Sequence, residues 1–379
     1  MDSRLAIGGA IALAIALIAA LSAAGWLFSQ PASQEKVKIG VMAPFSGQTA
    51  WWGEYIRQGI EIAFEELPEK EKQNIELVWE DDQCLSQPAV SAAQKLVFAD
   101  GVKFVIGPLC NESTIPTEEI FEGNKIISLT TGLPNDKIAS MGAYHFSFLP
   151  EIKELMKELA KFAFEKKESR RAAILYIQGD YGFENYYYFK KYFEDSGGKV
   201  VSEESFDISA TDVKTQIAKI KAQNPDSILI ASYGPNLILV LKQIEEASLG
   251  ATQRYGINAF EAQQVLQEAP LLAEGVIYPK AGSNEATQAM LDYAEKYREK
   301  FGAEADVYSA NAYDSFKILA ATIKECKSDS GCVLQEISGL KGYAGANGQF
   351  SLDERGVAKF EQILLKTVKN GKFVVLESQ

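Results

Sequence analysis

The residues best suited to chemistry in this sequence follow its short apolar, strand-like segments. In the first part of the chain these are Trp52, Asn111 and the adjacent hydroxyls Thr130 and Thr131. Hydroxyl groups and free backbone N–H groups at helix N-termini suit an anion such as a carboxylate. Trp52 offers a flat apolar wall that carries one polar N–H group. Taken alone, each residue also has an ordinary structural interpretation, such as Trp52 packing against the first helix.

The corresponding positions in the second part of the chain hold two tyrosines, an amide and an acid. These residues are Tyr181, Tyr233, Asn258 and Glu261. Tyrosines supply apolar walls with polar tips, and Glu261 could meet an ammonium group. The two sets together predict a site for a small zwitterion or polar molecule, whereas surface loop aromatics remain the alternative for Tyr181 and Tyr233.

Motifs for catalysis are scarce. The chain has one histidine, His145, which excludes two-histidine zinc motifs and leaves one candidate for a Ser-His-Asp triad. The sequence contains no P-loop, GxGxxG, GxSxG or CxxC motif. We interpret His145 as a packed core residue and predict a binding protein without a metal or cofactor. A hydrolase is the rival interpretation.

Net charge and chain length further limit the possible functions and the number of domains. Lys plus Arg number 38 and Asp plus Glu number 51, which gives a net charge of −13 over 379 residues. An acidic chain is a poor nucleic-acid binder, because phosphate contacts need a basic face. At roughly 100–200 residues per domain, the length predicts two or three domains.

Strand and helix patterns alternate along most of the chain. Alternating strands and amphipathic helices predict parallel sheets, and the pattern restarts after Pro150, so we expect two lobes. Ligands of such sheets bind beyond the carboxyl ends of the strands, where the residues above lie. The Asn370-Gly371 pair between apolar runs predicts a C-terminal hairpin. The main predicted strands are 37–43, 75–80, 104–106, 126–129, 172–177, 200–206, 227–231 and 255–257. The main predicted helices are 55–67, 88–99, 113–121, 151–167, 183–196, 212–222, 237–248, 284–301 and 308–324.

The N-terminal segment differs from the rest. Residues 5–28 contain no charge and one polar side chain, Ser22. As a helix this segment spans about 36 Å, against roughly 30 Å of membrane hydrocarbon. We predict that residues 1–30 form an uncleaved transmembrane anchor, with a cleaved signal as the alternative. Both place the remaining chain outside the cytoplasm, anchored in the first case and secreted or periplasmic in the second.

Four cysteines lie in the predicted extracytoplasmic part, at Cys84, Cys110, Cys326 and Cys332. An even count in an oxidising compartment predicts two disulfides, although four cysteines allow three pairings. Cys84 and Cys110 follow neighbouring predicted strands, which would bring them together at one end of the sheet. We therefore expect Cys84–Cys110 and Cys326–Cys332.

Several longer stretches carry a resemblance to a known family. They are KIGVMAPFSGQTAWWGE, LVWEDDQC, AVSAAQKLVFADGVKFVIGPLC, ISLTTG, GDYGFEN and AEGVIYP. With them the chain resembles the type I periplasmic binding proteins of ABC importers, specifically the leucine/isoleucine/valine-binding branch, over most of residues 36–379. The resemblance implies two doubly wound parallel-sheet lobes joined by a three-segment hinge, with crossings near residues 150, 280 and 355. It also implies that the DDQC and GPLC cysteines are joined.

The implied lobes divide the chain unevenly. Lobe one comprises 36–150 plus 281–354, and lobe two comprises 151–280 plus 355–379. In lobe one, the resemblance places the aromatic lid on Trp52 and the ligand-contacting hydroxyl position on Asn111, where the family usually has Ser. The turn that holds the ligand carboxylate falls on Ser128 to Gly132, through Thr130 and Thr131.

In lobe two, the implied aromatic walls fall on Tyr181 and Tyr233. The acid that meets the ligand ammonium falls on Asn258, which is not an acid, and Glu261 one turn further on is the predicted replacement. This departure leaves an amino acid, an amide and a short carboxylic acid open as ligands.

The implied function is that of an extracytoplasmic solute-binding protein, monomeric, delivering its ligand to an ABC permease complex by hinge closure. The alternative is the ligand-binding ectodomain of a sensor or chemoreceptor system with the same fold.

Overall fold

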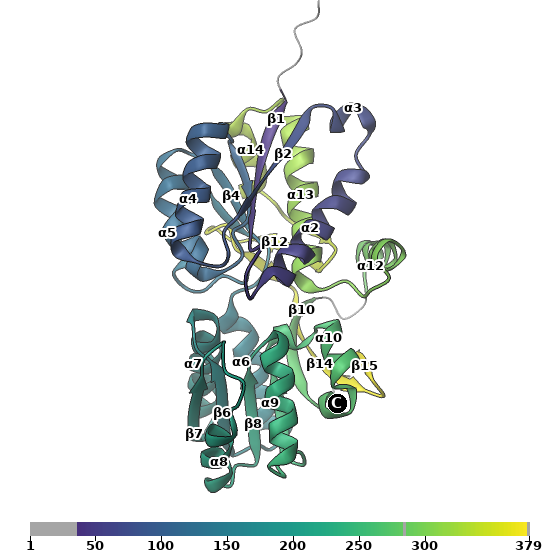
Figure 1. The fold of residues 1–379 in the computed structure, drawn as a ribbon. Coiled ribbons are helices and arrows are strands. Elements are labelled where there is room, and N and C mark those ends of the chain that lie inside the picture. The colour runs from purple at the N-terminus through teal and green to yellow at the C-terminus, as the bar shows by residue number, and fades with distance from the viewer. Residues whose placement is uncertain (1–35, 283–285, 377–379) are drawn as a thin grey trace, which may run out of the picture.

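The computed structural model describes residues 36–282 and 286–376. The transmembrane helix predicted within residues 1–30 lies outside these ranges. Among the described residues, no helix is both long and apolar enough to cross a membrane. The chain forms two main sheets that are stacked end to end, with helices on both faces of each (Figure 1). The predicted α/β class with parallel sheets is confirmed.

The first sheet has five parallel strands in the order β2-β1-β3-β4-β5. Helices α2 and α13 cover one face and α4 and α5 the other (Figure 1). The strands are β1 (Val37–Ala43), β2 (Ile75–Asp81), β3 (Phe104–Ile106), β4 (Ile127–Thr130) and β5 (His145–Ser147). The helices around them are α2 (Ala50–Glu65), α3 (Glu69–Lys72), α4 (Ser86–Gln94), α5 (Asn111–Gly123), α12 (Gln288–Phe301), α13 (Val307–Glu325) and α14 (Ser330–Ser338). A π-helical turn, Lys95–Asp100, continues α4, and a 3-10 turn covers Ile138–Ser140.

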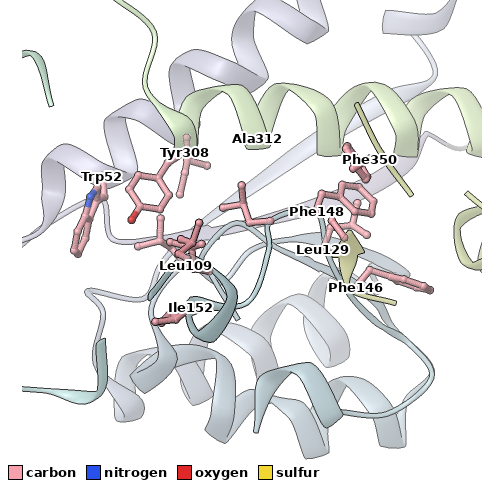
Figure 2. Close-up of a cluster of buried hydrophobic side chains, with 14 of the residues drawn as sticks. Trp52, Leu109, Leu129, Phe146, Phe148, Ile152, Tyr308, Ala312 and Phe350 are labelled. Carbon is pink, nitrogen blue, oxygen red and sulfur yellow. The ribbon is translucent and has the colours of Figure 1, made fainter. Parts of the chain in front are cut away.

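Burial on both faces explains the apolar sequence of β1. Ile39 and Val41 belong to the core cluster that includes Ile60 of α2 and Phe316 of α13. Met42 points to the opposite face and packs with alanines of α4. Because successive side chains alternate between faces, a strand covered on both faces reads as an unbroken apolar run. Figure 2 shows the first core extending along α13, with Trp52 and Tyr308 at one end and Phe350 at the other.

The second sheet has seven strands in the order β15-β14-β10-β9-β8-β6-β7. Strands β6 to β10 are parallel, and β14 and β15 add an antiparallel hairpin at the edge. The strands are β6 (Arg171–Ile177), β7 (Lys199–Phe206), β8 (Ser227–Ala231), β9 (Gln253–Gly256), β10 (Ile277–Gly282), β14 (Gln362–Lys369) and β15 (Lys372–Val375). The helices are α6 (Ile152–Glu165), α7 (Asp180–Asp195), α8 (Lys214–Ala222), α9 (Gly234–Glu246), α10 (Gln263–Glu268) and α11 (Pro270–Ala273), with a 3-10 turn at Asn258–Phe260. Asn370 and Gly371 form the predicted hairpin turn.

The chain passes between the sheets where β5 is followed by α6, where β10 is followed by α12 and where β13 is followed by β14. A small antiparallel sheet of β11 (Tyr343–Gly345), β12 (Gly348–Leu352) and β13 (Ala358–Phe360) precedes the last passage. Neither this sheet nor α14 was predicted from the sequence.

An ion cluster joins the first and last passages. The buried carboxylate of Glu151 contacts Arg355 and Lys153, each at 2.7 Å, and Lys359 at 3.2 Å. Burial alone would raise the pKa of Glu151, but hydrogen bonds and charges from Arg355 and Lys153 outweigh burial and lower this pKa to about 2. The Ser147 N–H also donates to the Gly356 carbonyl at 2.9 Å.

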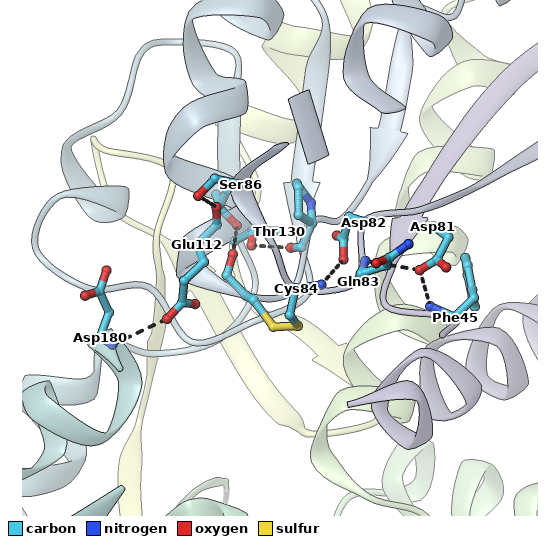
Figure 3. The surroundings of a disulfide bond; sticks show 12 residues. Phe45, Asp81, Asp82, Gln83, Cys84, Ser86, Glu112, Thr130 and Asp180 are labelled. Atoms are coloured by element: carbon cyan, nitrogen blue, oxygen red, sulfur yellow. Dashed lines mark hydrogen bonds between the residues drawn. A yellow bond between two sulfur atoms is a disulfide. The ribbon is translucent and has the colours of Figure 1, made fainter. Parts of the chain in front are cut away.

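Both predicted disulfides are present. Cys84 bonds to Cys110 with a Cα–Cα distance of 5.4 Å, and Cys326 bonds to Cys332 at 5.5 Å. Cys84 follows β2 and Cys110 precedes α5, so the first disulfide lies at the carboxyl end of the first sheet (Figure 3).

Candidate functional site

A cavity of about 440 Å³ lies between the two sheets, at the carboxyl ends of their parallel strands. This volume falls within the range of roughly 300–1,000 Å³ that is typical of small-molecule sites. The first half of the molecule contributes Thr49, Trp52, Gln83, Leu109, Asn111 and Glu112, among others. The second half contributes Gln178, Gly179, Tyr181, Gly182, Ile208 and Tyr233.

The starts of helices position the aromatic walls. The first helix begins at Ala50, not at Tyr55 as predicted, so Trp52 lies in its first turn. Tyr181 lies in the first turn of α7, and Tyr233 directly precedes α9. Gly182 lets α7 begin close to β6, since a Cβ atom at this position would lie 1.9 Å from the Ile177 carbonyl oxygen.

Four aromatic rings at the cavity contact one another across the two halves. The centroid of Trp52 lies 4.7 Å from that of Tyr233 and 5.9 Å from that of Tyr308. Tyr233 in turn lies 5.9 Å from Tyr181. The structure therefore brings together Trp52, Tyr181 and Tyr233, and adds Tyr308 from the first turn of α13.

Asn258 lies behind these rings and does not line the main cavity. Its Oδ1 accepts a hydrogen bond from the Tyr181 hydroxyl at 2.6 Å, and its Nδ2 lies 3.5 Å from the Tyr308 hydroxyl. Burial raises the pKa of Tyr308 to about 12 and that of Tyr181 well above its ordinary value. Both phenols are neutral at physiological pH, and Asn258 orients their hydroxyl groups.

Two polar groups at the cavity are buried without a hydrogen-bond partner among the described residues. They are the indole Nε1 of Trp52 and the amide Nδ2 of Asn111. Both are donors, and both residues line the cavity. Since buried donors normally have a partner, these two groups are candidates to donate to a bound molecule, although solvent does not reach either atom in this structure.

Glu112 is the only Asp, Glu, Lys, Arg or His residue that lines this cavity within the described ranges. Its Oε1 accepts a hydrogen bond from the Asp180 N–H of the second half at 3.4 Å (Figure 3). Burial, and then the charge of Asp180, raises the pKa of Glu112 above its ordinary value. The part of the cavity wall that the structure describes thus has a single carboxyl group and no Lys, Arg or His to pair with it.

The hydroxyls predicted to hold a carboxylate lie deeper than the cavity wall. Ser128 Oγ is 3.0 Å from His145 Nδ1, and Thr130 Oγ1 donates to the Pro108 carbonyl at 2.7 Å. Thr131 is fully buried. None of the three lines the cavity, because Ser128 and Thr130 belong to the fully buried strand β4 and Thr131 is buried directly after it, whereas Gly132 just beyond does line the cavity.

His145 is a core residue of β5, as interpreted from the sequence. Burial lowers its pKa to about 4, so the imidazole is neutral at physiological pH. It contacts Ser128 and is not among the residues at the cavity.

Glu261 does not line the main cavity either. Lys280 lies 3.1 Å from its carboxylate, and Lys366 donates a short hydrogen bond to it. Burial would raise the pKa of Glu261, but the two lysines outweigh burial and hold this pKa below its ordinary value. Its charge is therefore already paired within the protein and does not provide a free carboxylate for a ligand.

Among the cavity residues that were not predicted as ligand contacts, Glu112 and Tyr308 stand out, the first as a charged group and the second as an aromatic wall. Glu112 stands next to Asn111 in a segment that follows a strand, so its position was predictable and only its role was missed. Tyr308 comes from a helix whose preceding segment is not a strand of either sheet. Nothing in the local sequence signals its approach to Trp52.

Comparisons with known proteins agree with this architecture. A family model described as periplasmic binding protein matches residues 36–372. The leucine-, isoleucine-, valine-, threonine-, and alanine-binding protein of Pseudomonas aeruginosa is 26% identical over 350 residues, which cover 90% of this chain and 92% of that protein.

Two solved structures show the same fold. LivJ, a branched-chain amino acid transporter substrate binding protein from Streptococcus pneumoniae in complex with isoleucine, has a TM-score of 0.81 at 22% identity, covering 90% of this chain and 99% of that chain. An ABC transporter solute binding protein from R. palustris in complex with benzoate has a TM-score of 0.82 at 19% identity, covering 90% and 95%. The chain belongs to the periplasmic binding protein family, which confirms the predicted resemblance and the prediction of a solute-binding protein rather than an enzyme.

Proposed function

We propose that this protein is the extracytoplasmic solute-binding component of an ABC importer and traps a small amino-acid-like or amide ligand in the cavity between its two halves. The observation that carries the proposal is the contact of Trp52 from the first half with Tyr233 from the second, directly at the cavity. A ligand held there touches both halves and so stabilises their closed arrangement.

The proposed lobes follow the two sheets except at two boundaries, since β10 of the second sheet continues to Gly282 and β13 pairs with β12 of the small sheet. Lobe one comprises 36–150 plus 281–354, and lobe two comprises 151–280 plus 355–379. The ligand docks on Trp52 and Asn111 of lobe one, and closure brings Tyr181 and Tyr233 over it and excludes water. Ser128, Thr130, Thr131 and Asn258 support this site from behind, by fixing the loop after β4 and the phenol groups.

The closed form is what we expect the membrane permease of the importer to recognise. An anchor formed by residues 1–30 would hold the binding protein close to that permease and raise its effective concentration there. The structures with isoleucine and with benzoate show that proteins of this fold accept both kinds of ligand, so the fold alone does not select between an amino acid and a carboxylic acid.

A thermal-shift panel of amino acids, their amides and short carboxylic acids, measured on residues 31–379, tests the proposed function. A ligand present at 100 times its Kd adds about 2.7 kcal/mol to the free energy of unfolding, which raises the melting temperature clearly. Equilibrium dialysis should then show one ligand per chain, recovered chemically unchanged. Turnover of the ligand, or no stabilisation by any member of the panel, would contradict the proposal.

A further inference from the structure

We propose that Glu112 reads the charge of the ligand: its carboxylate receives an ammonium group, so the site selects a small α-amino acid over the matching carboxylic acid. This inference rests on the proposed function and specifies the ligand class. It moves the ammonium-binding charge from lobe two, where Asn258 and Glu261 were considered, to the first turn of α5 in lobe one.

The charges around the cavity support this assignment. Among the described residues that line it, Glu112 is the single charged one, and the lining contains no Lys, Arg or His. A ligand bearing only a carboxylate would meet a like charge in a partly buried space, where the repulsion is weakly screened. An ammonium group would instead form a charge-assisted hydrogen bond.

Glu112 also has capacity left for a ligand. Its backbone carbonyl is held by the Ser86 hydroxyl at 2.9 Å, which fixes the start of the side chain (Figure 3). Its carboxylate accepts backbone hydrogen bonds from the Asp180 N–H, at 3.4 Å, and from its own residue, although a carboxylate offers about four acceptor positions. The side chain therefore reaches the opposite lobe without being fully engaged by it.

The effect of the Glu112 charge extends across the cavity. The pKa of Tyr233 is raised first by burial and second by the Glu112 carboxylate. Tyr233 contacts Trp52, so the charge acts at the place where the rings of the two lobes meet. A cation bound at this point would also lie beside electron-rich ring faces, which adds a favourable interaction.

The remaining groups suit the other end of an amino acid. Trp52 Nε1 and Asn111 Nδ2 are donors without partners among the described residues, and both belong to lobe one. A ligand carboxylate would satisfy them, while the aromatic walls would cover an apolar side chain. Asn258 and Glu261 cannot replace Glu112, because the first binds two tyrosines and the second is paired with two lysines.

Matched ligand pairs test the inference on the full chain. The pairs are L-leucine with 4-methylpentanoate and L-phenylalanine with 3-phenylpropanoate, each differing by one amino group. In the wild type, we expect the amine-bearing member of at least one pair to bind more tightly. Glu112→Gln should weaken that member by about tenfold or more while leaving the acid unchanged or tighter, since a hydrogen bond to a charged group is lost.

Glu119→Gln is the matched control, because Glu119 is exposed on the same helix and its removal changes the net charge equally. We expect it to leave both members of each pair unaffected, and the unliganded melting temperature of each variant verifies folding. Equal or tighter binding of the acid by the wild type, or an equal loss of both members in Glu112→Gln, overturns the inference and leaves the solute-binding function standing. Failure of every amine to bind overturns it as well, and the wider panel then decides the proposed function.

Discussion

Glu112 and Glu261 are two carboxylates near the space between the lobes, and their surroundings contrast sharply. Glu261 has a side-chain exposure of 14% and contacts Lys280 and Lys366, themselves 19% and 13% exposed. Glu112 lines the cavity, where the described residues place no Lys, Arg or His, and it accepts backbone hydrogen bonds from Asp180 and from its own residue. A buried acid that the protein has already neutralised contributes to the fold, whereas an acid left without a cation is available to a ligand.

The largest effect that would sharpen this contrast is the destabilisation expected from Glu261→Gln. Removing one partner of a buried ion cluster leaves uncompensated charge, here on two lysines, and costs about 3–5 kcal/mol. Urea unfolding should show this loss, while ligand affinity measured on the folded fraction should change by less than about twofold. A large loss of affinity at full stability would restore Glu261 to the binding site.

A second, smaller effect concerns the aromatic walls of the cavity. Tyr233→Ala should weaken ligand binding by about 30-fold, because a central aromatic contact is typically worth about 2 kcal/mol. Tyr187→Ala is its control, since Tyr187 is an aromatic residue of the same lobe that is 47% exposed and does not line the cavity. Calorimetric titration with the ligand identified in the thermal-shift panel measures the affinity of each variant. Similar affinities for the two variants would remove Tyr233 from the site.

The smallest effect is a contrast in pH dependence. The pKa of Glu261 is lowered from 4.5 in the folded protein, so its stabilisation is present above that value and is lost as the pH falls. The pKa of Glu112 is raised from 4.5, so its contribution to stability is present below that value and is lost as the pH rises through the folded pKa. The contributions of the two acids to stability therefore change with pH in opposite directions.

We accordingly expect Glu112→Gln without ligand to be more stable than the wild type at pH 7, by up to about 1 kcal/mol, with the gain vanishing near pH 4. The deficit of Glu261→Gln should be greatest at pH 7 and should shrink below pH 4. Chemical denaturation at pH 7 and at pH 4 measures the free energy of unfolding of each variant relative to the wild type. A gain for Glu112→Gln that grows as the pH falls would contradict the sign of its raised pKa.

Much of the fold could be predicted because burial on both faces of a strand leaves a clear apolar run. VKIGVMA gives β1 and SILIA gives β8 with the bounds expected from the sequence. The short strands β11 and β13 have no such run, since they belong to a small sheet with mixed burial. The start of α2 was placed too late, although Trp52 lies four residues before Ile56 and so continues the spacing of the buried face.

The approach of a residue to the cavity was predictable where that residue follows a strand, whereas the ion pairing of a charged residue was not. Trp52, Tyr181 and Tyr233 meet at the cavity because loops at the same sheet end converge. The ion pairs of Glu261 could not be foreseen, because Lys280 and Lys366 lie 19 and 105 residues away in sequence and no local pattern indicates them. Tyr308 was not predicted at the site for the same reason, since its contact with Trp52 is distant in sequence.

The ion cluster around Glu151 has a mechanical consequence. Glu151 lies in the first passage between the sheets, and Arg355 and Lys359 lie next to the last one, so these two connections are fastened to each other at the level of their side chains. The Ser147 to Gly356 hydrogen bond fastens their backbones as well. We therefore expect these two connections to move together, so that the lobes swing about one axis with little sideways twisting. The lobes would then open and close along one path, so that the aromatic rings at the cavity return to the same relative positions after every cycle.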